Sequence, residues 1–167
     1  MSRRALVELL RGRGAHTDIV ECFRGLSADL ATRVVPGFPN TVWQQLGHVN
    51  YWMQYELARI GGAAPAYPEQ AALSWPRESG PGSGHKWDAE LRSFETLLVK
   101  LSRLAESSEA ELSRSIPSAH SSHQGVDTSI LGILWQTVVH NSYHLGQVVQ
   151  LRRALGAWPP PSGGDTW

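Results

Sequence analysis

The chain has 167 residues, a length typical of one domain and sufficient to bury a hydrophobic core without disulfide or metal support. Its 15 Lys and Arg residues balance 15 Asp and Glu residues, which argues against a nucleic-acid-binding protein, and its 41% apolar content argues against a disordered chain. The single cysteine, Cys22, excludes an internal disulfide and a zinc site built from cysteines.

The N-terminal segment 1–14 carries no export signal, because it lacks a long apolar core and a cleavage site. No apolar run approaches the roughly 18 residues that a transmembrane helix needs. We therefore expect a cytoplasmic protein with no membrane partner. Residues 3–10 are compatible with a short helix that ends before Gly12 and Gly14.

Two long helices are predicted in the first third of the chain. The first spans about 15–32, where apolar residues recur at steps of three and four: Ile19, Val20, Phe23, Leu26 and Leu30. Prolines and a glycine in 34–39 turn the chain. The second helix spans about 41–60, with Asn40 or Thr41 as its N-cap.

The remaining chain alternates loops with two further helices. Gly and Pro concentrate in a long loop, 61–85, and in a C-terminal tail, 156–167. Helical periodicity predicts helices over about 86–106 and 128–155, separated by a Ser-rich loop. Since no segment shows sustained two-residue alternation, we expect an all-α fold, a single four-helix bundle over residues 1–167.

A pair of histidines on the last predicted helix is the first candidate for chemistry. His140 and His144 are four residues apart, so both imidazoles lie on one helix face at the edge of the apolar stripe. A shared metal ion would satisfy both rings. Chance placement gives about 0.3 such pairs in this chain, so two half-exposed, hydrogen-bonded histidines remain an equal alternative on spacing alone.

A third histidine strengthens the metal interpretation. His48 lies in the middle of the second helix and reaches the pair if the second and last helices are neighbours in the bundle. Three histidines with an open position are typical of a catalytic zinc site. Trp52, one turn beyond His48, is a candidate pocket wall, and Gln147, one turn beyond His144, is a candidate to support a ligand.

No catalytic residue beyond the metal ligands is identified from the sequence. Glu56 is the nearest acidic residue on the second helix, but it lies two turns from His48 and off its stripe. The other histidines are weaker candidates. His16 is placed at the start of the first predicted helix, His85 is expected to cap a helix or face solvent, and His120 and His123 are expected to be solvated in the Ser-rich loop. Most tryptophans are expected to fill the core or pin loops.

Two segments resemble the DinB/YfiT-like superfamily: HNSYHLGQVVQLRRALGAW at 140–158 and PNTVWQQLGHVNYW at 39–52, with RGAH at 13–16 similar to the N-terminal signature of some members. The resemblance implies an up-down-down-up four-helix bundle, commonly a homodimer, whose metal ligands are His48, His140 and His144. It also implies a metal-dependent transferase or isomerase that uses a low-molecular-weight thiol, while some relatives are hydrolases.

The sequence departs from the family pattern at two places. Tyr143 and Leu145 flank His144 where many members read H-x-x-H-H-R-G-Q, and Gly47 precedes His48 where several members have an acidic residue. Neither change removes a ligand, but both leave the subfamily and its substrate open.

Two functions are compatible with these residues. In the first, a divalent metal, zinc or nickel with iron or manganese as further candidates, activates a thiol or water for attack on an electrophilic small molecule. Neutral imidazoles leave the metal charge uncompensated, which favours an anionic ligand such as thiolate. In the second, the bundle is a non-catalytic module, with or without metal, that binds a small molecule or associates with itself.

Overall fold

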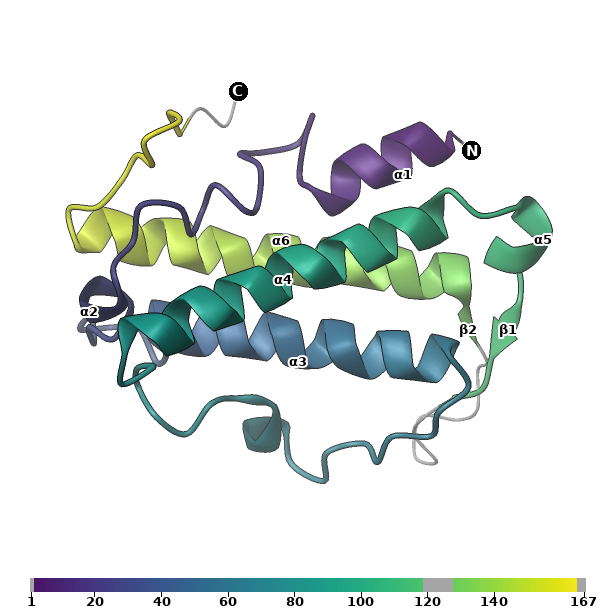
Figure 1. Ribbon diagram of the computed structural model, residues 1–167, viewed down its shortest axis with the longest axis horizontal. Coiled ribbons are helices and arrows are strands. Elements are labelled where there is room, and N and C mark those ends of the chain that lie inside the picture. The colour runs from purple at the N-terminus through teal and green to yellow at the C-terminus, as the bar shows by residue number, and fades with distance from the viewer. Residues whose placement is uncertain (1, 119–127, 165–167) are drawn as a thin grey trace.

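The computed structural model describes residues 2–118 and 128–164, and Figure 1 shows its helices stacked alongside one another. The bundle is built from four helices: α1 (Arg3–Leu10), α3 (Val42–Ile60), α4 (Gly84–Ala105) and α6 (Ile130–Ala154). In Figure 1, α3 and α4 run in one direction, while α1 and α6 run in the other. The all-α fold class is therefore confirmed.

Short elements connect these helices. They are α2 (Ala28–Ala31), a 3-10 turn η1 (Ala71–Ser74) in the loop from α3 to α4, and α5 (Glu109–Leu112). Two strands of two residues each, β1 (Ser115–Ile116) and β2 (Thr128–Ser129), pair antiparallel just before α6. In the described residues, this pair is the only sheet, and none of the helices is long and apolar enough to cross a membrane.

The core lies where α3 packs against α4 and α6. These helices contribute side chains that are at most 1% exposed, among them Leu46, Val49, Met53, Phe94, Leu98, Leu134, Leu145 and Val148. Burying each such side chain contributes about 1.5–3 kcal/mol. The α3–α6 contact brings the predicted His48 helix next to the predicted His140–His144 helix.

Local signals explain where the long helices begin. Thr41 caps α3: its hydroxyl accepts the Gln44 backbone N–H, and the Gln44 side chain accepts the Thr41 N–H. Ser83 and Ser129 cap α4 and α6 through their hydroxyls alone, which accept the backbone N–H groups of Lys86 and Gly132. As a result, α3, α4 and α6 begin and end within two residues of the predicted spans.

The predicted helix over 15–32 is wrong. Residues 11–27 form successive turns, and only Ala28–Ala31 is helical. Gly25 adopts a φ of 74°, which breaks a helix, and the buried guanidinium of Arg152 takes up backbone carbonyls that a helix would otherwise use. Of the apolar residues at helical spacing, Ile19, Val20, Phe23 and Leu26 are nevertheless buried and Leu30 is half-buried. The spacing therefore indicates burial here, and α1 supplies the first helix of the bundle.

Candidate metal centre

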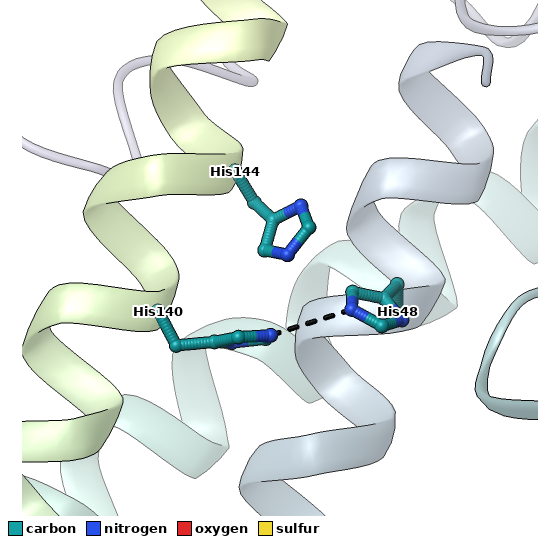
Figure 2. A group of neighbouring side chains, drawn as sticks. All are labelled: His48, His140 and His144. Carbon is teal, nitrogen blue, oxygen red and sulfur yellow. Dashed lines mark hydrogen bonds between the residues drawn. The ribbon is translucent and has the colours of Figure 1, made fainter. Parts of the chain in front are cut away.

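His48, His140 and His144 converge between α3 and α6. One ring nitrogen from each residue can be chosen so that the three lie within 4.8 Å of one another, and the Nε2 atoms of His48 and His140 are 3.3 Å apart. Figure 2 shows the three rings pointing into the space between the two helices. His48 and His144 are each 6% exposed, and His140 is half-buried. The second and last long helices are therefore neighbours, and His48 lies beside His140 and His144 as that arrangement predicts.

Hydrogen bonds fix which nitrogen of His48 faces the cluster. The Nδ1 atom of His48 lies 3.3 Å from the Ser74 carbonyl and 3.1 Å from its hydroxyl. A carbonyl oxygen only accepts, so Nδ1 carries the hydrogen and Nε2 keeps its lone pair. This lone pair faces His140 at hydrogen-bonding distance. A proton on one nitrogen joins the two rings, and a metal cation bound by both lone pairs would take its place.

His144 is oriented by a relay of two glutamines. Its Nδ1–H donates to Gln45 Oε1 at 2.8 Å, and Gln45 Nε2 donates to Gln147 Oε1 at 2.9 Å. The Nε2 atom of His144 is thereby left as a possible ligand. Gln147, predicted to support a ligand, contacts Gln45, which the sequence did not single out, and Gln45 contacts His144.

The electrostatics of the cluster favour neutral rings. Burial, together with the neighbouring imidazoles as a smaller cause, lowers the pKa of His48 to about 4 and that of His144 to about 3. Burial also lowers the pKa of His140. Metal binding requires deprotonated ligands, so all three rings are in the required state at neutral pH.

Two tryptophans border the cluster. Trp52 meets the His48 ring edge-on with 6.4 Å between centroids, in the place expected of a pocket wall. The Trp75 ring stacks on one face of the His48 imidazole, with ring centroids 3.8 Å apart and ring planes 10° from parallel. Periodicity does not single out Trp75, because this residue lies in the Gly/Pro-rich loop. Its contact with His48 depends on how that loop folds back over α3.

A cleft of about 140 Å³ opens beside the cluster. Its walls include Trp52, Met53, Glu56, Thr137 and His140. Glu56, which the sequence placed off the His48 stripe, therefore lines the same cleft as His140, one of the candidate metal ligands. Burial raises the pKa of the Glu56 carboxyl, and Arg59 opposes that rise through an ion pair of 2.7 Å.

The remaining histidines that the structure describes lie elsewhere. His16 bridges the Thr17 carbonyl at 2.8 Å and the Ser142 hydroxyl at 2.9 Å, which joins the N-terminal loop to α6. His85 is exposed in the first turn of α4. His120 and His123 lie outside the described residues. Burial raises the pKa of the Cys22 thiol to about 12, so this cysteine is not a thiolate at neutral pH.

Comparison with known proteins identifies a family. A family model described as the DinB superfamily matches residues 13–148, a range that contains all three clustered histidines. Searches of curated proteins and of solved structures gave no match.

Proposed function

Since the chain belongs to the DinB superfamily, we propose that His48, His140 and His144 bind one divalent metal ion and that the protein is a metal-dependent transferase for small molecules. The observation that supports this most directly is the convergence of three buried, neutral imidazoles beside a cleft. Such an ion, bound with an open position, lowers the pKa of a thiol or water and so supplies a nucleophile at neutral pH.

The donor set favours a thiol as the activated group. Within the described residues, the cluster consists of histidines alone, with no carboxylate to offset a metal charge of +2. An anionic ligand such as thiolate provides that compensation. Imidazole ligands suit zinc and nickel, our preferred metals, and also iron and manganese.

The cleft residues would hold an electrophilic small molecule. Trp52 and Met53 offer apolar contact, while Glu56 provides a carboxylate in the same cleft. The raised pKa of Glu56 suits a group that accepts a proton from a bound thiol or water, directly or through solvent.

Metal analysis is the first test of the ligand assignment. Purified wild-type protein should contain about one equivalent of metal, and His144→Ala should lose it. His85→Ala is the matched control, because His85 is exposed and is not one of the three clustered histidines. Metal retained in full by His144→Ala would refute the assignment. A screen of small thiols against electrophiles then tests the transferase, with water as the competing nucleophile.

A non-catalytic, self-associating bundle is the second candidate. Its support is an exposed apolar pair one turn apart on α6, since Val139 is 66% exposed and Tyr143 is 68% exposed. We propose that this face contributes to a homodimer. Light scattering after gel filtration should show a dimer that Tyr143→Glu weakens. Bound metal without turnover on any thiol–electrophile pair would favour this second function.

A further inference from the structure

The segment that leads from η1 towards α4 is fastened to one face of α3. Thr41 Oγ1 donates to the Ser79 carbonyl at 2.7 Å, and Gln44 Nε2 donates to the Pro76 carbonyl at 3.1 Å. One turn further along α3, Gly47 faces the Pro76 ring so closely that a Cβ atom there would collide with Pro76 Cγ. Gly47 is therefore the residue that permits this segment to lie against the helix.

This attachment places two residues directly on His48. Ser74 is 3% exposed, and both its carbonyl and its hydroxyl are within hydrogen-bonding distance of His48 Nδ1. The next residue, Trp75, covers one face of the His48 ring and also lies edge-on to His144, with centroids 5.5 Å apart. One side of the cluster is thus covered by the loop, while the cleft opens on the His140 side.

We infer that Ser74, Trp75 and Pro76 form a positioning and specificity-determining wall of the metal centre, and that Gly47 makes this wall possible. Ser74 holds His48 with hydrogen on Nδ1, so that Nε2 faces the cluster. Trp75 blocks approach over the His48 ring, so a ligand for the metal enters from the cleft beside His140. The site consequently accepts slender thiols in preference to bulky ones. The selectivity for thiols rests on the proposed function, whereas the control of His48 does not.

A matched pair of glycine substitutions tests the role of Gly47. Gly47→Ala forces Pro76 away from α3, whereas Gly146→Ala, in α6, places its new methyl group where no atom beyond its chain neighbours and the adjacent helix backbone lies within 4 Å. In metal-free protein, nitrogen NMR of the His48 ring should show hydrogen on Nδ1 in wild type and in Gly146→Ala. Gly47→Ala should shift the ring towards a mixture of tautomers. An unchanged His48 spectrum in folded Gly47→Ala would overturn the inference.

Cobalt binding supplies the second measurement. Loss of a partner that orients a metal ligand typically weakens metal affinity by about 10–100-fold. We expect that loss for Co²⁺ in Gly47→Ala and no loss in Gly146→Ala. Equal Co²⁺ affinities in the two variants would contradict the inference. Absence of Co²⁺ binding by wild type would instead overturn the proposed function, while the NMR comparison would still decide the role of the loop.

Trp75→Ala tests the wall itself without disturbing α3. In the Co²⁺-loaded protein, the visible thiolate-to-cobalt band reports binding of 2-mercaptoethanol and of the bulkier naphthalene-2-thiol. Removal of the Trp75 ring should improve the relative affinity for the bulky thiol by about tenfold, while Trp75→Phe, which preserves a stacked ring, should stay close to wild type. The same thiol preference in Trp75→Ala as in wild type would show that Trp75 sets no limit on the ligand.

Discussion

The residues behind the histidines decide which nitrogen atoms are available to a metal. Gln45 is 1% exposed, and its amide directs Oε1 to the imidazole of His144 and Nε2 to Gln147 Oε1. This arrangement fixes the hydrogen of His144 on Nδ1. Replacing Gln45 therefore alters the orientation of His144, although Gln45 is not itself a candidate metal ligand.

We predict that Gln45→Leu lowers metal affinity by about 10–100-fold, because His144 loses the acceptor that orients it. Gln45→Glu keeps an acceptor at that position and should restore most of the affinity. Titration with Zn²⁺ against a competing chelator measures both. Gln54→Leu is the control, since Gln54 is an exposed glutamine on the same helix. Wild-type affinity in Gln45→Leu would exclude a role for Gln45 in orienting His144.

At this scale, the sequence predicts the ligands better than their supports. His140 and His144 share a face because of the helical period, and His48 follows once the second and last helices are taken as neighbours. Ser74 and Trp75 reach His48 only because a loop folds back across α3, and a contact between residues 26 positions apart has no local pattern. The requirement for glycine at position 47 likewise follows only from the folded structure, in which Pro76 packs against that residue.

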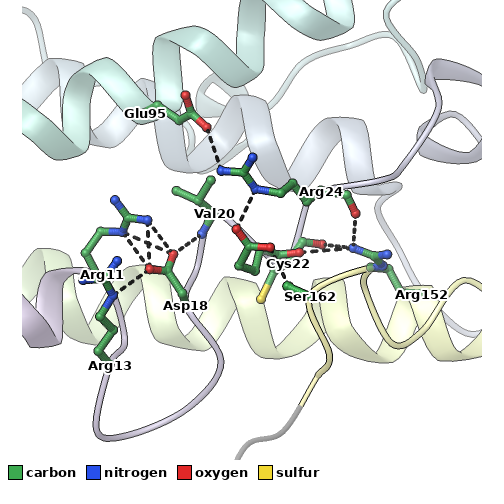
Figure 3. Close-up of polar contacts among 10 residues, drawn as sticks. Arg11, Arg13, Asp18, Val20, Cys22, Arg24, Glu95, Arg152 and Ser162 are labelled. Carbon is green, nitrogen blue, oxygen red and sulfur yellow. Dashed lines mark hydrogen bonds and ion pairs between the residues drawn. The ribbon is translucent and has the colours of Figure 1, made fainter.

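At the scale of elements, the segment 11–27 shows how a chain can be ordered without a helix. Arg152 is 2% exposed and lies at the end of α6, where Figure 3 shows its guanidinium directed at backbone carbonyls. Its donors reach the carbonyls of Cys22 at 2.7 Å, Arg24 at 3.0 Å and Ala157 at 2.9 Å. One side chain thereby satisfies acceptors that secondary structure would otherwise pair.

We predict that Arg152→Met destabilises the protein by about 3 kcal/mol or more, because each buried acceptor left unpaired costs about 1–3 kcal/mol. The adjacent Arg153 is exposed, so Arg153→Met should change the free energy of unfolding by less than about 0.5 kcal/mol. Urea denaturation of both variants provides the comparison. Equal stabilities would mean that the carbonyls find other donors when Arg152 is lost.

The other end of this segment is held by Asp18. Its carboxylate accepts from Arg11 Nη2 at 2.9 Å, from Arg13 Nε at 2.9 Å and from the Val20 backbone N–H at 2.9 Å (Figure 3). Burial acts to raise the pKa of Asp18, but these hydrogen bonds and the charge of Arg11 outweigh it and lower the pKa below 3.8. The carboxylate form is therefore stabilised by folding.

The lowered pKa of Asp18 fixes the sign of a pH effect. Its contribution to stability is complete above the ordinary pKa of 3.8 and is lost as the pH falls through the lower value of the folded protein. We predict that Asp18→Asn is less stable than wild type near neutral pH and that the difference shrinks in acid. Denaturation curves at about pH 7 and about pH 3 measure it. A difference that stays constant between those two conditions would contradict this assignment.

The segment 11–27 also marks what periodicity cannot distinguish. Ile19, Phe23 and Leu26 recur at helical steps and are buried, but they reach the core from turns. Hydrophobic spacing reports which residues face inward, whereas the helix itself depends on backbone hydrogen bonds. Here those bonds compete with Asp18 and Arg152, and the positive φ of Gly25 favours the turn.

At the scale of the whole molecule, the candidate metal centre joins elements that are distant in the sequence. His48 belongs to α3, His140 and His144 belong to α6, and Ser74 and Trp75 attach the loop between α3 and α4. The three ligands come together only in the folded chain. Metal binding is therefore coupled to folding, because the unfolded chain offers no preformed site.

We predict that metal raises the thermal stability of the entire bundle. A ligand that binds only the folded state at 100 times its dissociation constant adds about 2.7 kcal/mol, which corresponds to an increase in Tm of about 5–10 °C for a chain of this size. Calorimetry of metal-free protein with and without Zn²⁺ measures the shift. His144→Ala should lose most of it, and His85→Ala should retain it. An equal shift in all three proteins would locate the stabilising metal away from this cluster, since His144 would then contribute nothing to its binding.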